Sequence, residues 1–332
     1  MQSHSQGHGP HHAQHGPIGW HKRHQAVKQA GGWRQLLKEP IDKKSWDHPF
    51  EREISSESLL SKSFLLTPGV LPDLQAVGRQ TPPQSIDPHR RRMVATVAEQ
   101  QHLLFEAICK AWTAQHTWLI KLQMSDIRDI QAELASRMTA AGNWPEKELL
   151  EWSAKKNRAM DSLEDARLAG ERQFAEVRLA LQLAQSELEF TNARLQRPTL
   201  WTLGIAQSDP ESLSERARRA VQKAPGPLGP PLDLWRSYQG THLAFEQVKS
   251  AHRSLERASE HADLATRLLS EAVLKYNGMF ISTFELLDHQ IEKLEAERDV
   301  VQSTSALLQR QSASQRASLQ TLFLEIDFGV RS

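Results

Sequence analysis

From about residue 93 onward, apolar residues recur at steps of three and four, which is the spacing of one face of an α-helix. One run, apolar except for a threonine, consists of Phe174, Val177, Leu181, Ala184, Leu188, Thr191 and Leu195. Another has Leu255, Ala258, Ala262, Ala265, Leu269, Ala272 and Tyr276. A third begins with Phe284, Leu287, Ile291, Leu294 and Val301. Such heptad seams are typical of helices that pack side by side. The chain is therefore predicted to be mainly α.

Three interruptions divide this pattern. AAGNWPEKELL (140–150) and KYNGMFISTFELLD (275–288) each have the composition of a helix–turn–helix junction, whereas 197–232 contains four prolines and two glycines within 225–231. We predict two long antiparallel coiled-coil hairpins, residues 93–196 and 233–325, joined by a Pro/Gly-rich linker, residues 197–232. Glu-Leu-Leu opens the second helix of both hairpins, a short match that fits either an internal duplication or coincidence.

Residues 1–92 lack helical periodicity, and we expect them to be mostly disordered or loosely packed. Seven histidines fall within the first 24 residues. Imidazole is a good ligand for copper, nickel and zinc, but neither Cys nor an acidic residue joins these histidines, which argues against a closed zinc site. The tract is either a weak metal-binding segment or a low-complexity tail. The candidate ligands are His4, His8, His11, His12 and His15.

The composition and the motifs of the sequence argue against several classes of function. A formal net charge of +1 argues against a nucleic-acid-binding protein. The single cysteine, Cys109, lies in an apolar run and is predicted to be a buried, inert thiol. Neither a transmembrane helix nor a signal peptide is evident, so a cytoplasmic location is one reading. The sequence offers no nucleophile motif or phosphate-binding loop, so we expect a protein that is not an enzyme and has no cofactor.

The stretch 275–288 has the local chemistry of a hairpin tip. Asn277 and Gly278 can adopt the left-handed conformation that ends a helix. Ser282 and Glu285 have the spacing of a capping box at the start of the next helix. Between them stand three apolar residues, Met279, Phe280 and Ile281. These side chains are covered either by another part of the chain or by a partner.

The same stretch resembles the second periplasmic turn of the TolC family of outer-membrane efflux channel proteins. RMTAAGNWPEKELLEW (137–152) resembles the first turn in the branch associated with copper and heavy-metal resistance. The resemblance implies a homotrimeric export tunnel that works with a periplasmic adaptor protein and an inner-membrane pump. It also implies docking of the adaptor at two tips, formed by Gly142, Asn143, Trp144, Asn277, Gly278, Met279, Phe280, Ile281 and Ser282.

The resemblance covers about 93–200 and 233–325. We do not recognise the alternating segments of membrane β-strands that this family also carries. The expected function is a non-enzymatic efflux component of the outer membrane or periplasm that exports metal ions or small molecules. The alternative is a soluble coiled-coil scaffold, or a degenerate relative without transport activity.

Overall fold

The computed structural model describes residues 50, 52–59, 88–184, 187–199, 215, 219 and 232–327. By its internal contacts the chain divides into two units, Met1–Phe50 and Glu51–Ser332, and all of the helices and strands described here belong to the second. The histidine-rich tract and the Pro/Gly-rich stretch 225–231 lie outside the described residues.

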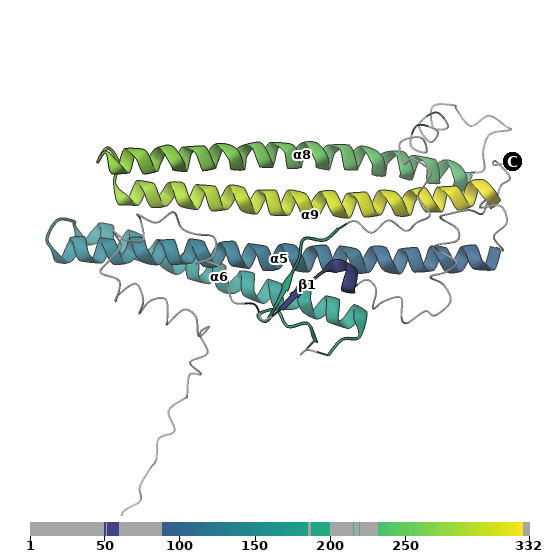
Figure 1. The fold of residues 1–332 in the computed structure, drawn as a ribbon, viewed down its shortest axis with the longest axis horizontal. Coiled ribbons are helices and arrows are strands. Elements are labelled where there is room, and N and C mark those ends of the chain that lie inside the picture. Colours follow the sequence, from purple (N-terminus) through teal and green to yellow (C-terminus); the bar gives the residue numbers. More distant parts are fainter. Residues whose placement is uncertain are drawn as a thin grey trace, which may run out of the picture. The chain divides into compact units, whose positions relative to one another are not determined.

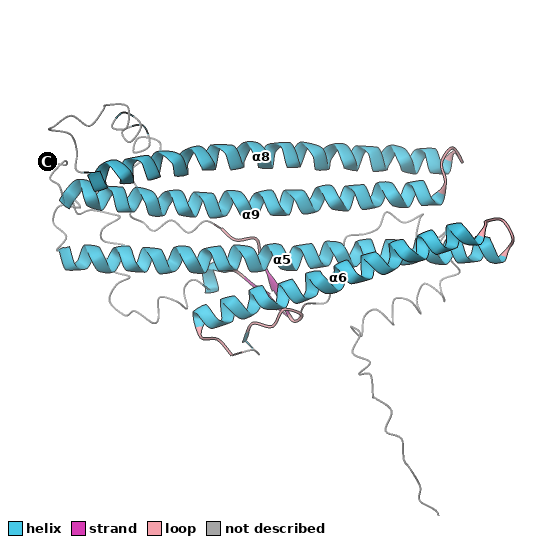
Figure 2. Ribbon diagram, turned by 180° about the vertical axis from the view of Figure 1, so that it is seen from behind, coloured by secondary structure: helices cyan, strands magenta, loops and turns pink. Residues whose placement is uncertain are grey.

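Four long helices make up most of the second unit (Figure 1). Helices α5 (Pro88–Ala140) and α6 (Glu146–Leu181) form one antiparallel hairpin, and α8 (Leu232–Asn277) and α9 (Thr283–Asp327) form the other. The main helix contacts join α6 to α5, α5 to α9 and α9 to α8 (Figure 2). The prediction of a mainly α fold with two long helical hairpins is confirmed.

The predicted seams of the second hairpin face its interior. Every seam position of α8 is at least partly buried, and Ala265 and Ala272 are buried. In α9, the first four seam positions are buried because this helix has α8 on one side and α5 on the other. The small alanines of α8 allow its backbone to approach α9 closely, so the burial follows directly from the heptad pattern.

The first hairpin departs from the prediction at its end. Helix α6 stops at Leu181 and does not continue to about residue 196. Gln182 adopts a left-handed conformation (φ 54°), and the Leu183 N–H donates to the Arg178 carbonyl at 2.9 Å, which closes the helix as a Schellman motif. Leu188 is still buried, as the heptad requires, but it belongs to a segment that folds back toward α5 and α6.

Residues 187–199 are held in this position by a glycine and a glutamine. Gly170 of α6 lies directly against the Phe190 ring, where a Cβ atom would overlap the ring. The side chain of Gln115, fully buried in α5, makes three hydrogen bonds of 2.7–3.0 Å to the backbone of this segment. Both N–H donors of its amide nitrogen, and one of the two acceptor positions of its amide oxygen, are thus directed at one returning segment.

A short parallel pairing completes the unit. Strand β2 (Ala193–Leu195) pairs with β1 (Arg52–Ile54), with Arg52 opposite Ala193 and Ile54 opposite Leu195. A helical turn follows β1, and its Leu59 side chain is only 2% exposed. Residues 52–59 are thus an ordered part of the stretch 1–92 that was expected to be mostly disordered or loosely packed, because β2 supplies the hydrogen-bonding partner that this stretch lacks by itself.

Candidate functional site

The turn between α5 and α6 is a Schellman motif. The Asn143 N–H donates to the Met138 carbonyl and the Gly142 N–H donates to the Thr139 carbonyl, both at 2.9 Å. Gly142 has a φ of +75°, the left-handed conformation that this motif requires and that glycine adopts without steric cost. Sequence and backbone thus agree at this tip.

The turn between α8 and α9 has the same hydrogen bonds but places a different residue at the left-handed position. The Phe280 N–H donates to the Lys275 carbonyl and the Met279 N–H donates to the Tyr276 carbonyl, both at 2.9 Å. Met279 has a φ of 62°, so the prediction that Asn277 or Gly278 takes this conformation is wrong. The hydrogen bond from the Phe280 N–H to the Lys275 carbonyl requires the residue before Phe280, which is Met279, to be left-handed. For a residue with a Cβ atom this conformation has a steric cost of about 1–2 kcal/mol.

Gly278 has a separate role in this turn. A Cβ atom at this position would lie 2.7 Å from Cε2 of Phe280. The absence of a side chain therefore leaves room for the Phe280 ring beside the backbone at the end of α8.

The predicted capping box is present at the start of α9. The Ser282 N–H donates to Glu285 Oε2 at 2.7 Å, and the Glu285 N–H donates to Ser282 Oγ at 3.2 Å. The Ser282 hydroxyl also donates to Glu285 Oε2, at 3.0 Å. The hydrogen bonds that this carboxylate accepts, first from the Ser282 backbone N–H and then from the Ser282 hydroxyl, lower the pKa of Glu285. The box satisfies backbone donors that would otherwise be free and so fixes the direction in which α9 leaves the turn.

The two apolar side chains at this tip point into solvent. Met279 is 92% exposed and Phe280 is 83% exposed, whereas Ile281 is half-buried. The sequence left open whether the rest of the chain or a partner covers these side chains. In the part of the chain that the structure describes, no residue covers Met279 or Phe280. Two adjacent exposed apolar side chains, one of them on a strained backbone, are the pattern expected of a contact site.

The α5–α6 tip differs because its aromatic residue is already packed. The Trp144 ring stacks on Phe284 of α9 with 4.8 Å between ring centroids, and Trp152 of α6 contacts the same ring at 4.7 Å. Phe284 itself is buried. This aromatic contact joins the two hairpins, so both turns lie at the same end of the helices (Figure 1). Gly142 and Asn143 are exposed.

Polar contacts beside the tips reinforce the junction between the hairpins. Arg128 of α5 donates to Asp288 of α9 at 2.8 Å, and the fully buried Gln131 donates to the same carboxylate at 3.1 Å. Neither these contacts nor the Trp144–Phe284 stacking was predicted. The paired residues are about 140–160 positions apart in sequence, and the sequence pattern gives no sign of which ones meet.

Apolar side chains also remain exposed on the two outer helices, α6 and α8. Among the described helices, each has one main neighbour, and neither lies between two helices as α5 and α9 do. The large exposed side chains are Leu150, Met160, Leu168 and Leu179 on α6, and Leu232, Leu243, Leu264, Leu268, Val273 and Leu274 on α8.

Two other sequence predictions concern metals and the thiol. The candidate ligands His4, His8, His11, His12 and His15 lie outside the described residues, and the described residues contain no cluster of three or more His, Cys, Asp or Glu side chains that could hold a metal ion. Cys109 is buried, and burial raises the pKa of its thiol to about 12, which disfavours the reactive thiolate. None of the described helices is long and apolar enough to cross a membrane.

No protein-family model and no curated protein matches this sequence. Solved structures do match. The outer-membrane channel OprN is 13% identical, with 79% of this chain and 72% of OprN aligned at a TM-score of 0.53. A membrane protein from Pseudomonas aeruginosa is 14% identical, with coverage of 78% and 72% and a TM-score of 0.52. The match to CusC has a TM-score of 0.43, which is too low to carry an argument about the metal-resistance branch. The comparisons confirm at the level of the fold the predicted likeness to outer-membrane efflux channels.

Proposed function

We propose that this protein is a non-enzymatic component of an outer-membrane efflux system, in which its two hairpins form part of the wall of an export tunnel. The proposal is supported by the fold shared with the outer-membrane channel OprN and by two hairpins whose turns lie at one end. It is also supported by the two turn motifs that the sequence shares with the TolC family.

The α8–α9 tip is the main docking site for a periplasmic adaptor protein. The observation that carries this assignment is the exposure of Met279 and Phe280 on a turn whose backbone is fixed by hydrogen bonds and by the capping box. A rigid turn loses little conformational entropy on binding, so most of the burial energy of two apolar side chains is available for affinity. Asn277, Gly278, Ile281 and Ser282 frame the pair. Gly142, Asn143 and Trp144 contribute less, because Trp144 is already packed on Phe284.

Self-association is supported by the apolar side chains on the outer helices. An α6 face of one copy against an α8 face of the next would bury leucines such as Leu168 and Leu264, which are about half-exposed in the single chain. Burial of apolar surface is the usual driving force of such contacts. The number of copies, three, follows from the likeness to the TolC family. The assembly works with an inner-membrane pump, and its cargo is metal ions or small molecules.

The docking assignment is tested by measuring adaptor affinity of the full-length protein by biolayer interferometry, with the periplasmic adaptor proteins of the source bacterium as probes. Phe280→Asp removes the apolar contact and should weaken binding at least about tenfold, since burial of a Phe side chain contributes about 1.5–3 kcal/mol. Leu103→Asp is the matched control, because it places the same charge at a residue 54% exposed on α5 and should leave affinity unchanged.

Trp144→Ala tests the difference between the tips and should weaken binding less than Phe280→Asp does. Circular dichroism of each variant establishes that the helices are retained. Undiminished binding of Phe280→Asp would reject the α8–α9 tip as the docking site.

A further inference from the structure

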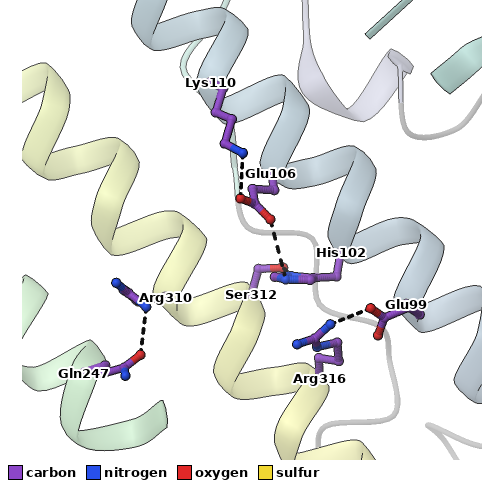
Figure 3. Close-up of polar contacts among 8 residues, drawn as sticks. All are labelled: Glu99, His102, Glu106, Lys110, Gln247, Arg310, Ser312 and Arg316. Carbon is purple, nitrogen blue, oxygen red and sulfur yellow. Dashed lines mark hydrogen bonds and ion pairs between the residues drawn. The ribbon is translucent and has the colours of Figure 1, made fainter. Parts of the chain in front are cut away.

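A histidine that is largely shielded from water lies at the contact between the two hairpins (Figure 3). It is far along α5 from the turn at Ala140. The side chain of His102, on α5, is 10% exposed. Its Nδ1 lies 2.8 Å from the Ser312 hydroxyl oxygen of α9, a hydrogen bond that crosses from one hairpin to the other. A neutral imidazole fits this position, because one ring nitrogen can pair with the hydroxyl group.

Three charged groups act on His102, and a fourth, Lys110, pairs with one of them. Glu99, Glu106 and Lys110 come from α5, and Arg316 comes from α9. Glu106 Oε1 accepts from Lys110 at 2.8 Å, and Glu99 Oε1 accepts from Arg316 at 2.5 Å. Both carboxylates therefore already have cationic partners, and the nearest, Glu106, is 4.0 Å from His102 Nε2.

Protonation would bring a fifth charge into this group and leave a net positive cluster. Burial lowers the pKa of His102, the nearby Arg316 guanidinium lowers it further, and Glu106 and Glu99 oppose the change only in part. A cation at this depth is costly without a partner of its own, and the cost is removed if the helices separate enough to admit water.

We propose that His102 is a pH-sensitive contact between the two hairpins: protonation of its imidazole places a cation beside Arg316 and separates α5 from α9 at this level. The junction near the tips does not depend on this contact. There the hairpins are joined by the apolar cluster of Ile120, Ile127, Leu287, Ile291 and Leu294, and by the Arg128–Asp288 ion pair. Acidification therefore loosens one part of the junction while the tip end stays closed.

The test is the distance between α5 and α9 measured by pulsed electron paramagnetic resonance on the full-length protein. Spin labels are attached at Leu103→Cys on α5 and Gln320→Cys on α9, both exposed positions, with the native thiol removed by Cys109→Ser. At pH 7.5 a single short-distance population is expected. At pH 5 a second, longer-distance population should appear, while the far-UV circular dichroism stays unchanged.

Two variants from opposite helices should abolish the longer-distance population. His102→Gln keeps a hydrogen-bonding side chain that cannot take up the proton. Arg316→Gln removes the opposing cation and frees Glu99 to pair with the imidazolium. His116→Gln is the matched control, because it removes another shielded histidine of α5, one that lies near Arg194 of the returning segment, and it should keep the response. An unchanged distance at pH 5 in the parent protein, or a second population that persists in His102→Gln, would overturn the proposal.

Discussion

The shifted pKa of His116 predicts how the free energy of unfolding changes with pH. The imidazole of this residue is largely shielded from water where α5 meets the returning segment 187–199. Its ring contacts the Trp112 ring with 4.9 Å between centroids. Burial lowers the pKa of His116 from 6.5 to about 4, and the positive charge of Arg194 adds to the effect. The folded protein therefore holds this imidazole neutral at pH values where the unfolded chain would protonate it.

The direction of the pH dependence follows from that difference. Above the unfolded value of 6.5 both states are neutral and stability is fully present. As the pH falls from 6.5 toward about 4, the unfolded chain binds the proton and the folded protein does not, so the free energy of unfolding decreases. At about 1.4 kcal/mol per pKa unit the full loss is about 3 kcal/mol, and about 2 kcal/mol of it has occurred at pH 5.

The perturbation is His116→Gln, which removes the titrating group. Urea unfolding followed by circular dichroism gives the free energy of unfolding of both proteins at pH 8 and pH 5. The parent protein should lose about 2 kcal/mol more between these pH values than the variant does. His102 and the carboxylates titrate in both proteins, so their contributions cancel in the difference. An equal loss in the two proteins would refute the reasoning.

Three further predictions concern stability. Met279→Gly should raise the free energy of unfolding by about 0.5–1 kcal/mol, because the relief of left-handed strain exceeds the entropic cost of glycine. Adaptor binding should fall. A variant that is less stable than the parent protein would contradict the assigned strain. Gln115→Leu should cost about 3 kcal/mol or more in urea unfolding, since three backbone groups lose their partner in the interior, and a cost under about 1 kcal/mol would show that water replaces the amide. Gly170→Ala should lower the free energy of unfolding by about 1–3 kcal/mol, because the added Cβ atom overlaps the Phe190 ring. Protease cleavage within 187–199 should become faster. An unchanged cleavage rate would mean that the ring moves aside without an energetic cost.

The sequence predicted what depends on neighbours along the chain. The heptad steps predicted the hairpins, and the Ser282–Glu285 spacing predicted the capping box, because both patterns act over three or four residues. The left-handed residue was misplaced by one or two positions because propensity favours Gly278, whereas the hydrogen-bond register puts Met279 there.

Contacts between distant segments could not be predicted in this way. Strand β1 pairs with β2 across about 140 residues, and nothing in Arg52–Ile54 alone identifies that partner. The heptad of α6 continues past Leu181 as a pattern, yet Leu188 reaches the interior by a chain reversal. A buried apolar position satisfies the same pattern whether a helix or a returning loop supplies it.

The measurement that tests the proposed function most directly is fractionation of the cells that naturally produce the protein, followed by sizing of the fraction that contains it. If the protein is an efflux component, it should be recovered with the outer membrane as a trimer, and this is the result that we expect. Recovery as a soluble cytosolic monomer or dimer would contradict the account, because the exposed Met279–Phe280 tip could then not meet a periplasmic adaptor and the chain would not form a trimer at the outer membrane.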